Sequence, residues 1–300
     1  MTGTGAGVST QPRFAQLKVN VKAQARKCNM TPQYLSGDAY RPKPRVDRQF
    51  IADCVESDGR KVLLLGDSFA NAISTHVAYA AMEIGYEFKL IFGYNCPYPL
   101  DFRNVAFNAV AACDVDPSAL QTELLKDVHR GDIVVLRLYF PKAQYIGYSD
   151  SDLQQWPGEL LAAYDVEIAS LHQRIAEKGA AMLLIGSNPT VESSPICSNP
   201  QWFNRSQHAA CSVLQLRTSL PTRFAFHHDL HLRDRFSGNG SSLRVIAPTL
   251  LFCDAARDAC SLSKDGEFLW SDNHHIVGGG VDLFYPEMLS DLRDLAGAAK

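Results

Sequence analysis

Short apolar runs alternate along the chain with longer stretches whose apolar residues recur at helical spacing. The apolar runs predict strands at residues 61–65, 87–92, 132–138, 181–185 and 243–247. The helical spacing predicts helices at residues 70–84, 118–129, 158–178 and 281–296, with a further helical region interrupted by Pro221. Strands that are apolar on both faces are typical of a parallel sheet covered by helices on both sides. We therefore predict an α/β protein of three layers with a central parallel sheet of about five strands.

The first 58 residues differ in composition from the rest, because Pro, Gly and basic residues are frequent there. We interpret residues 1–58 as an N-terminal extension or linker, with 1–12 disordered, and residues 59–300 as one folded domain. With 300 residues, of which 46% are hydrophobic, the chain is long enough to bury a large core.

Charge argues against one class of partner, and hydropathy against a membrane-spanning segment. The net charge of −3 and the lack of a long basic cluster argue against nucleic-acid binding. No stretch of the sequence is apolar for the length needed to span a bilayer, and the first residues lack the features of a signal peptide.

Eight cysteines fall into four neighbouring pairs without any C-x-x-C doublet: Cys28 and Cys54, Cys96 and Cys113, Cys197 and Cys211, Cys253 and Cys260. Zinc sites usually need closer doublets, so we expect disulfides between these neighbours, with the first pair tethering the extension. Disulfides in turn predict a periplasmic or extracellular location. The alternative is a reduced cytosolic protein with buried thiols.

The first predicted strand breaks into Gly66, Asp67 and Ser68 before an amphipathic helix. A serine on such a strand-to-helix turn lies at the rim of a sheet, beside the amide groups of a helix N-terminus, as catalytic nucleophiles do. The same three residue types are also ordinary turn and N-cap residues, and that alternative stays open.

A partner for the serine lies near the other end of the chain, where Asp272 and His275 stand three positions apart. In a turn, this spacing lets the carboxylate orient the imidazole while the other ring nitrogen faces a serine. The alternative is that Asp272 caps the last helix and the histidines are polar loop residues.

The two motifs together resemble the opening and closing motifs of the SGNH hydrolases, also called GDSL-type esterases. Residues 251–254, Cys260 and residues 268–275 more narrowly resemble the SGNH domains fused to acyltransferase family 3 membrane proteins, as do residues 95–97. The resemblance covers residues 60–297. It implies a flavodoxin-like α/β/α fold, with Ser68 as nucleophile, His275 as general base and Asp272 as its orienting group.

The resemblance also implies an oxyanion hole, in which the backbone N–H groups of Ser68 and Gly93 donate to the developing charge. The family has an asparagine after the third strand, where this sequence has Arg137. Asn71, Asn95 or Asn188 are candidates to replace it, as is Arg137 itself. Alternatively, Arg137 pairs with a carboxylate in a structural network.

Two other groups of residues give weaker indications of a binding site. The histidines and aspartates of residues 227–234 lack the pattern of a metal site, and we expect no metal or other cofactor. The aromatic residues of the segment 139–156 either stack on a sugar ring or pack a loop: Tyr139, Tyr145, Tyr148 and Trp156.

The resemblance implies O-acetylation of a cell-envelope polysaccharide, with an acyl donor and a carbohydrate acceptor as partners. We expect a monomer that acts with a membrane acyltransferase domain, from which this chain is an excised extracytoplasmic piece. One alternative is a secreted carbohydrate esterase that removes acetyl groups, with water as acceptor. Another is a glycan-binding module with a decayed site.

Overall fold

A computed structural model of the protein describes twelve stretches of the chain: residues 30–31, 48–50, 59–92, 117–137, 158–189, 220–238, 242–254, 259–261, 263–264, 267–270, 275–276 and 278–298.

A seven-stranded sheet with the order β1-β2-β4-β3-β5-β6-β7 forms the centre of the molecule. Its five parallel strands are β3 (Lys61–Gly66), β4 (Glu87–Phe92), β5 (Ile133–Arg137), β6 (Ala181–Ile185) and β7 (Leu243–Ile246). All five predicted strands are thereby confirmed. In register, Gly66 lies beside Phe92 and Arg137, and Arg137 lies beside Ile185, so the carboxyl ends of four strands share one edge.

Two short strands of the N-terminal segment extend the sheet at one side. β1 (Met30–Thr31) and β2 (Arg48–Phe50) pair antiparallel with each other, and β2 pairs antiparallel with β4. These five residues of the predicted N-terminal extension thus belong to the central sheet, and the division of the chain at residue 58 stays a prediction. The expected disorder of residues 1–12 lies outside the described residues.

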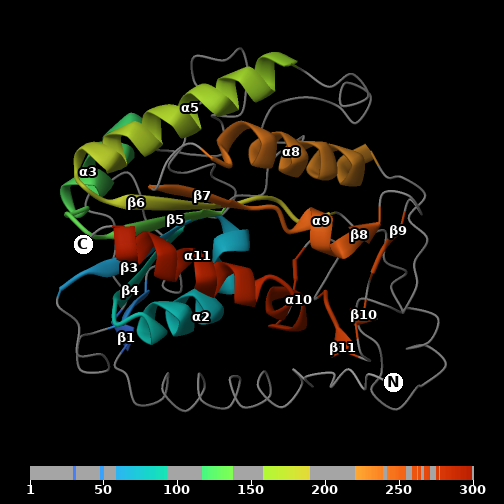
Figure 1. Ribbon diagram of the computed structural model, residues 1–300, viewed down its shortest axis with the longest axis horizontal. Coiled ribbons are helices and arrows are strands. Elements are labelled where there is room, and N and C mark those ends of the chain that lie inside the picture. The colour runs from blue at the N-terminus through green and yellow to red at the C-terminus, as the bar shows by residue number, and fades with distance from the viewer. Residues whose placement is uncertain are drawn as a thin grey trace, which may run out of the picture.

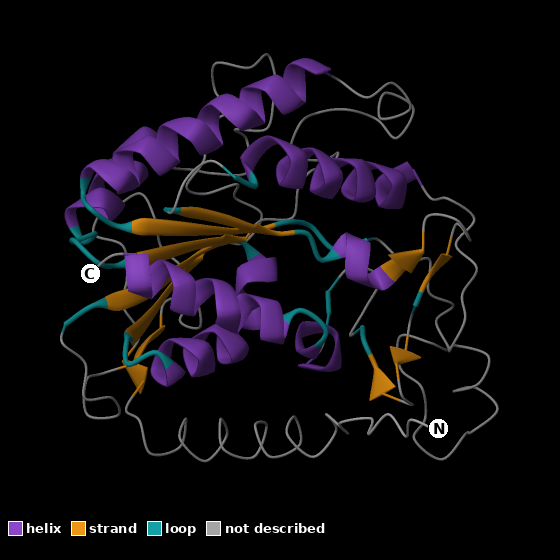
Figure 2. Cartoon of the chain, viewed as in Figure 1, coloured by secondary structure: helices purple, strands orange, loops and turns teal. Residues whose placement is uncertain are grey.

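Helices cover both faces of the sheet, which confirms the predicted three layers. On one side lie α2 (Ser68–Glu83), α10 (Gly278–Asp282) and α11 (Tyr285–Ala298) (Figure 1). On the other lie α3 (Pro117–Lys126), α5 (Gly158–Glu177) and α8 (Leu220–Phe236) (Figure 2). Because neither face meets water, every residue of β5 and β6 is buried.

Two helix predictions differ from the structure. The helix expected over 281–296 is divided into α10 and α11 by a turn at Leu283 and Phe284. Pro221 is the second residue of α8, in its first turn, where its missing N–H group disrupts no helical hydrogen bond, so the helix is not interrupted by this proline.

Several short elements follow β7 beyond the carboxyl ends of the strands (Figure 1). These are α9 (Thr249–Phe252), the antiparallel pair β8 (Cys253–Asp254) and β9 (Ala259–Cys260), and the pair β10 (Ser263–Lys264) and β11 (Glu267–Phe268). None of the helices in the described stretches is long and apolar enough to cross a membrane.

Candidate active site

Gly66 makes the turn between β3 and α2 possible. Its φ angle of +148° lies in a region that residues with a side chain rarely adopt. A Cβ atom at this position would also lie 1.7 Å from the backbone oxygen of Arg137 on the neighbouring strand. The glycine therefore lets the chain turn sharply against β5 and present Ser68 as the first residue of α2.

Asp67 is the N-cap of α2 and occupies the first free N–H groups of the helix. Its Oδ1 accepts a hydrogen bond from the Phe69 N–H at 2.9 Å, and its backbone oxygen accepts from Ala70 and Asn71. Within the described part of the chain, the Ser68 N–H has no acceptor. N–H groups of a first helical turn, such as this one beside the serine hydroxyl, are typical donors to anionic oxygens.

Ser68 and His275 meet in the structure although 207 positions separate them. The distance from Ser68 Oγ to His275 Nε2 is 2.9 Å, which is a hydrogen bond. The imidazole is half-buried and packs against Phe69, with 4.8 Å between the ring centres. A histidine nitrogen in this position can accept the proton of the serine hydroxyl.

The other residues expected around the serine are only partly described. Asp272, Gly93 and Asn95 lie outside the described residues, as do the aromatic residues of segment 139–156. Asn71 lies exposed on α2.

Arg137 ends β5 and is fully buried. Its Nη2 donates to Asn188 Oδ1, and its guanidinium lies 5.3 Å from the centre of the Phe284 ring. Burial lowers the pKa of Arg137 to about 10, against the opposing effect of the carboxylates of Asp229 and Asp67. The side chain therefore keeps its charge at neutral pH inside the protein, with Asn188 as a hydrogen-bonding partner.

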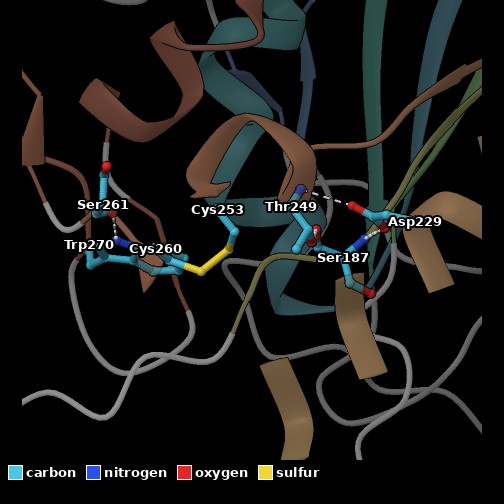
Figure 3. Close-up of a disulfide and its surroundings, with 7 residues drawn as sticks. All are labelled: Ser187, Asp229, Thr249, Cys253, Cys260, Ser261 and Trp270. Carbon is cyan, nitrogen blue, oxygen red and sulfur yellow. Dashed lines mark hydrogen bonds between the residues drawn. A yellow bond between two sulfur atoms is a disulfide. The ribbon is translucent and has the colours of Figure 1, made fainter. Parts of the chain in front are cut away.

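Asn188 follows β6 in a buried loop that is held from α8. Asp229 Oδ1 accepts from the Ser187 N–H and its Oδ2 accepts from the Thr249 N–H, both at 2.9 Å. Both bonds are drawn in Figure 3. Thr249 Oγ1 donates to the Ser187 backbone oxygen at 3.0 Å. Asp229 thus joins the end of β6 to the start of α9.

Burial raises the pKa of Asp229 to about 7, while the bonds from Thr249 and Ser187 and the charge of Arg137 oppose this rise. Asp229 is one of the aspartates of residues 227–234, for which the sequence predicts no metal site. A signal for its actual role was present, since it shares one helical face with the buried residues Ala225 and Leu232, and a carboxylate on an apolar face needs partners.

The remaining polar residues of α8 have separate surroundings. His231 Nε2 lies 2.9 Å from Asp165 Oδ1, and His228 packs edge-on against Tyr164. The described stretches contain no group of three potential ligands placed to hold a metal ion.

Cys253 and Cys260 form a disulfide between β8 and β9, as their spacing predicts. The other six cysteines lie outside the described residues, so their pairing stays a prediction.

Known proteins resemble this chain in sequence pattern and in fold. The family model described as "SGNH domain (fused to AT3 domains)" matches residues 37–289. Among solved structures, the periplasmic domain of a lipopolysaccharide acetyltransferase from Salmonella ser. Paratyphi A aligns with a TM-score of 0.52 at 16% identity, over 78% of this chain and 84% of that chain.

A putative acylhydrolase from Bacteroides fragilis NCTC 9343 aligns with a TM-score of 0.43 at 13% identity, over 94% of this chain and 98% of that chain. No curated protein matches the sequence significantly. At these identities the structural likenesses concern the fold alone.

Proposed function

Because the chain belongs to the family of SGNH domains fused to AT3 domains, and so is an acyl-transferring or hydrolytic enzyme, we propose that Ser68 is its nucleophile and His275 its general base. The observation that carries this proposal is the 2.9 Å contact between Ser68 Oγ and His275 Nε2. Asp272 is the proposed third member, which orients the imidazole and stabilises its protonated form.

The reaction proceeds in two halves. His275 Nε2 accepts the hydroxyl proton as Ser68 Oγ bonds to the carbonyl carbon of the acyl donor, and then returns that proton to the leaving group. An acceptor hydroxyl next gives its proton to Nε2 and attacks the acyl-serine, which releases the acylated acceptor and restores the Ser68 hydroxyl. With water as acceptor, the same residues hydrolyse the ester.

The Ser68 N–H, which has no acceptor among the described residues, is the first proposed donor to the oxyanion, and the Gly93 N–H is the second. Asn188, Asn95 and Arg137 are the candidates for a side-chain donor. The complete burial of Arg137 and its bond to Asn188 favour a role behind Asn188 over direct contact with the substrate.

We base the proposed substrate on the family of the chain and on one protein of similar fold. The domains of this family are fused to AT3 domains, and one similar fold is the periplasmic domain of a lipopolysaccharide acetyltransferase. The proposed activity is O-acetylation of a cell-envelope polysaccharide outside the cytoplasm, in concert with a membrane acyltransferase. Carbohydrate deacetylation is the second candidate, because the same Ser68–His275 pair serves it with water as acceptor. The Ser68–His275 contact disfavours a decayed binding module.

The nucleophile is tested with Ser68→Ala, and Ser74→Ala is the matched control on the same helix. We expect Ser68→Ala to lower kcat for para-nitrophenyl acetate hydrolysis by about 1,000-fold or more, because the acyl-enzyme cannot form. Ser74 donates to the backbone oxygen of Asn71, and its loss should leave the rate unchanged. Equal activity of Ser68→Ala and the wild type would contradict the proposal.

A transferase and an esterase would both release para-nitrophenol in the first assay. A second assay is therefore needed to separate the two candidate functions. An acetyl donor and a de-O-acetylated cell-envelope polysaccharide are incubated with the enzyme, and acetyl groups on the glycan are followed by NMR. Gain of acetyl groups that depends on Ser68 supports the transferase, whereas loss of acetyl groups from the native glycan supports the esterase.

A further inference from the structure

One main-chain contact lies directly beside His275. Trp270 and Ile276, which stand on either side of residues 271–275 in the sequence, form an isolated antiparallel bridge, here called the base. Both side chains are buried. Helix α10 packs tightly on this base, since a Cβ atom on Gly280 would lie 2.6 Å from the Leu269 backbone oxygen and 2.8 Å from Ile276 Cβ.

Trp270 connects this base to the disulfide-bonded hairpin β8–β9. Its indole Nε1 donates to the Ser261 backbone oxygen at 3.2 Å, and its ring lies 5.2 Å from the ring of Phe252. The Ser261 N–H in turn donates to the Phe252 backbone oxygen at 2.8 Å. Figure 3 shows the bond from Trp270 to Ser261 together with the Cys253–Cys260 disulfide.

The hairpin itself is fixed at two points. The disulfide joins Cys253, directly after α9, to Cys260. The start of α9 is held through Thr249 by the buried carboxylate of Asp229. A continuous line of contacts therefore runs from α8 through α9, the disulfide and Trp270 to the residue beside His275.

We infer that Trp270 and the Cys253–Cys260 disulfide form a brace whose task is to position His275 against Ser68. This inference rests on the proposed function. Trp270 is a positioning residue, because it acts through Ile276 and touches no reacting atom. A small displacement of the imidazole lengthens the 2.9 Å contact on which proton transfer depends, so loss of the brace should slow the chemical step and leave substrate binding alone.

The test is Trp270→Phe, which removes the indole donor and keeps a ring against Phe252. Tyr86→Phe is the control, since it also removes a polar atom from a buried aromatic residue, but just before β4 at the opposite end of the strands from Ser68. The hydrolysis of para-nitrophenyl acetate by each full-length protein is measured well below its melting temperature.

For Trp270→Phe we expect kcat to fall about 10- to 100-fold, as for a catalytic group displaced by up to about 1 Å. KM should stay within about twofold of the wild-type value, because binding of the substrate is not altered. Tyr86→Phe should match the wild type in both constants. If Trp270→Phe does not fold, the double variant Cys253→Ser/Cys260→Ser tests the same brace from its other side, with the same expected split between kcat and KM.

The outcomes separate this inference from the proposed function. A folded Trp270→Phe protein with wild-type kcat overturns the brace, even while Ser68→Ala is inactive. An equal loss of kcat in Tyr86→Phe overturns it too, because the effect would then be general. Activity that survives Ser68→Ala instead overturns the proposed function itself.

Discussion

At the scale of single residues, the position of the proposed nucleophile depends on Gly66, which has no Cβ atom. The missing side chain of Gly66 leaves room for the Arg137 backbone oxygen, and its φ angle of +148° directs the chain into α2. Any side chain at this position must push β3 and β5 apart or rotate the turn. Either change moves Ser68, which lies two residues further on.

Gly66→Ala should therefore destabilise the protein by about 3 kcal/mol or more, through steric overlap added to backbone strain. Gly85→Ala is the matched control, because Gly85 also has a positive φ angle, of +76°, but open space where a Cβ would lie. Strain alone should cost that variant about 1 kcal/mol. Urea unfolding measures both values, and equal losses would show that the contact with Arg137 is unimportant.

At the scale of elements, the sequence predicts those strands whose residues must be apolar because they are buried on both faces. The strands β3, β5 and β6 are apolar at successive positions because both faces of the sheet are covered, so the apolar runs predict their ends to within one residue. The break between α10 and α11 escapes prediction, since Phe284 continues the apolar spacing of Val281 and Met288 through the turn. Strands of two or three residues, such as β1 and β2, are too short to show a period.

In the candidate site, too, only part of the arrangement can be predicted from the sequence. The Gly66–Ser68 turn and the Asp272–His275 spacing predict that Ser68 and His275 meet, because both motifs carry their chemistry in side chains. The task of Asp229 was missed because its hydrogen-bonding partners are the backbone N–H groups of Ser187 and Thr249, which any residue type except proline would supply.

The ionised carboxylate of Asp291 on helix α11 destabilises the folded protein. Partial burial, together with the carboxylates of Glu287 and Asp294, raises the pKa of Asp291 to about 6, with Arg244 opposing. Since the folded protein binds this proton more tightly than the unfolded chain, ionisation of Asp291 destabilises the fold progressively from pH about 4 to about 6.

Asp291→Asn removes that ionisation. We expect it to raise the free energy of unfolding at pH 8 by about 1 kcal/mol after solvent screening, and to have no such effect at pH about 3.5. Asp294→Asn, an equal charge change at an exposed position on the same helix, should give a smaller gain. Urea unfolding at both pH values measures the difference, and a gain that is the same at both would contradict the assignment.

At the scale of the whole molecule, one core joins helices that lie far apart in the sequence. Buried residues of α2, such as Ile73 and Val77, belong to the same cluster as Met288 and Leu292 of α11. The helix that begins with Ser68 and the helices that follow His275 are therefore packed against the sheet as one unit. We expect the active site and the fold to be lost together.

Leu292→Ala tests this coupling. The variant should lose about 2–5 kcal/mol of stability, because it leaves a cavity in the shared core. Its urea transitions, followed by circular dichroism and by ester hydrolysis, should shift together. Val166→Ala, at a position 65% exposed, should change the stability by less than about 0.5 kcal/mol. Activity that disappears before the secondary structure would show that the site unfolds separately.

The separation of 207 positions between Ser68 and His275 has a consequence for the newly made chain. The ribosome makes Ser68 long before it makes His275. Every reaction that needs both side chains therefore waits until the segment that carries the histidine has docked. Under the proposed mechanism, a polypeptide that stops before residue 275 is inert toward esters.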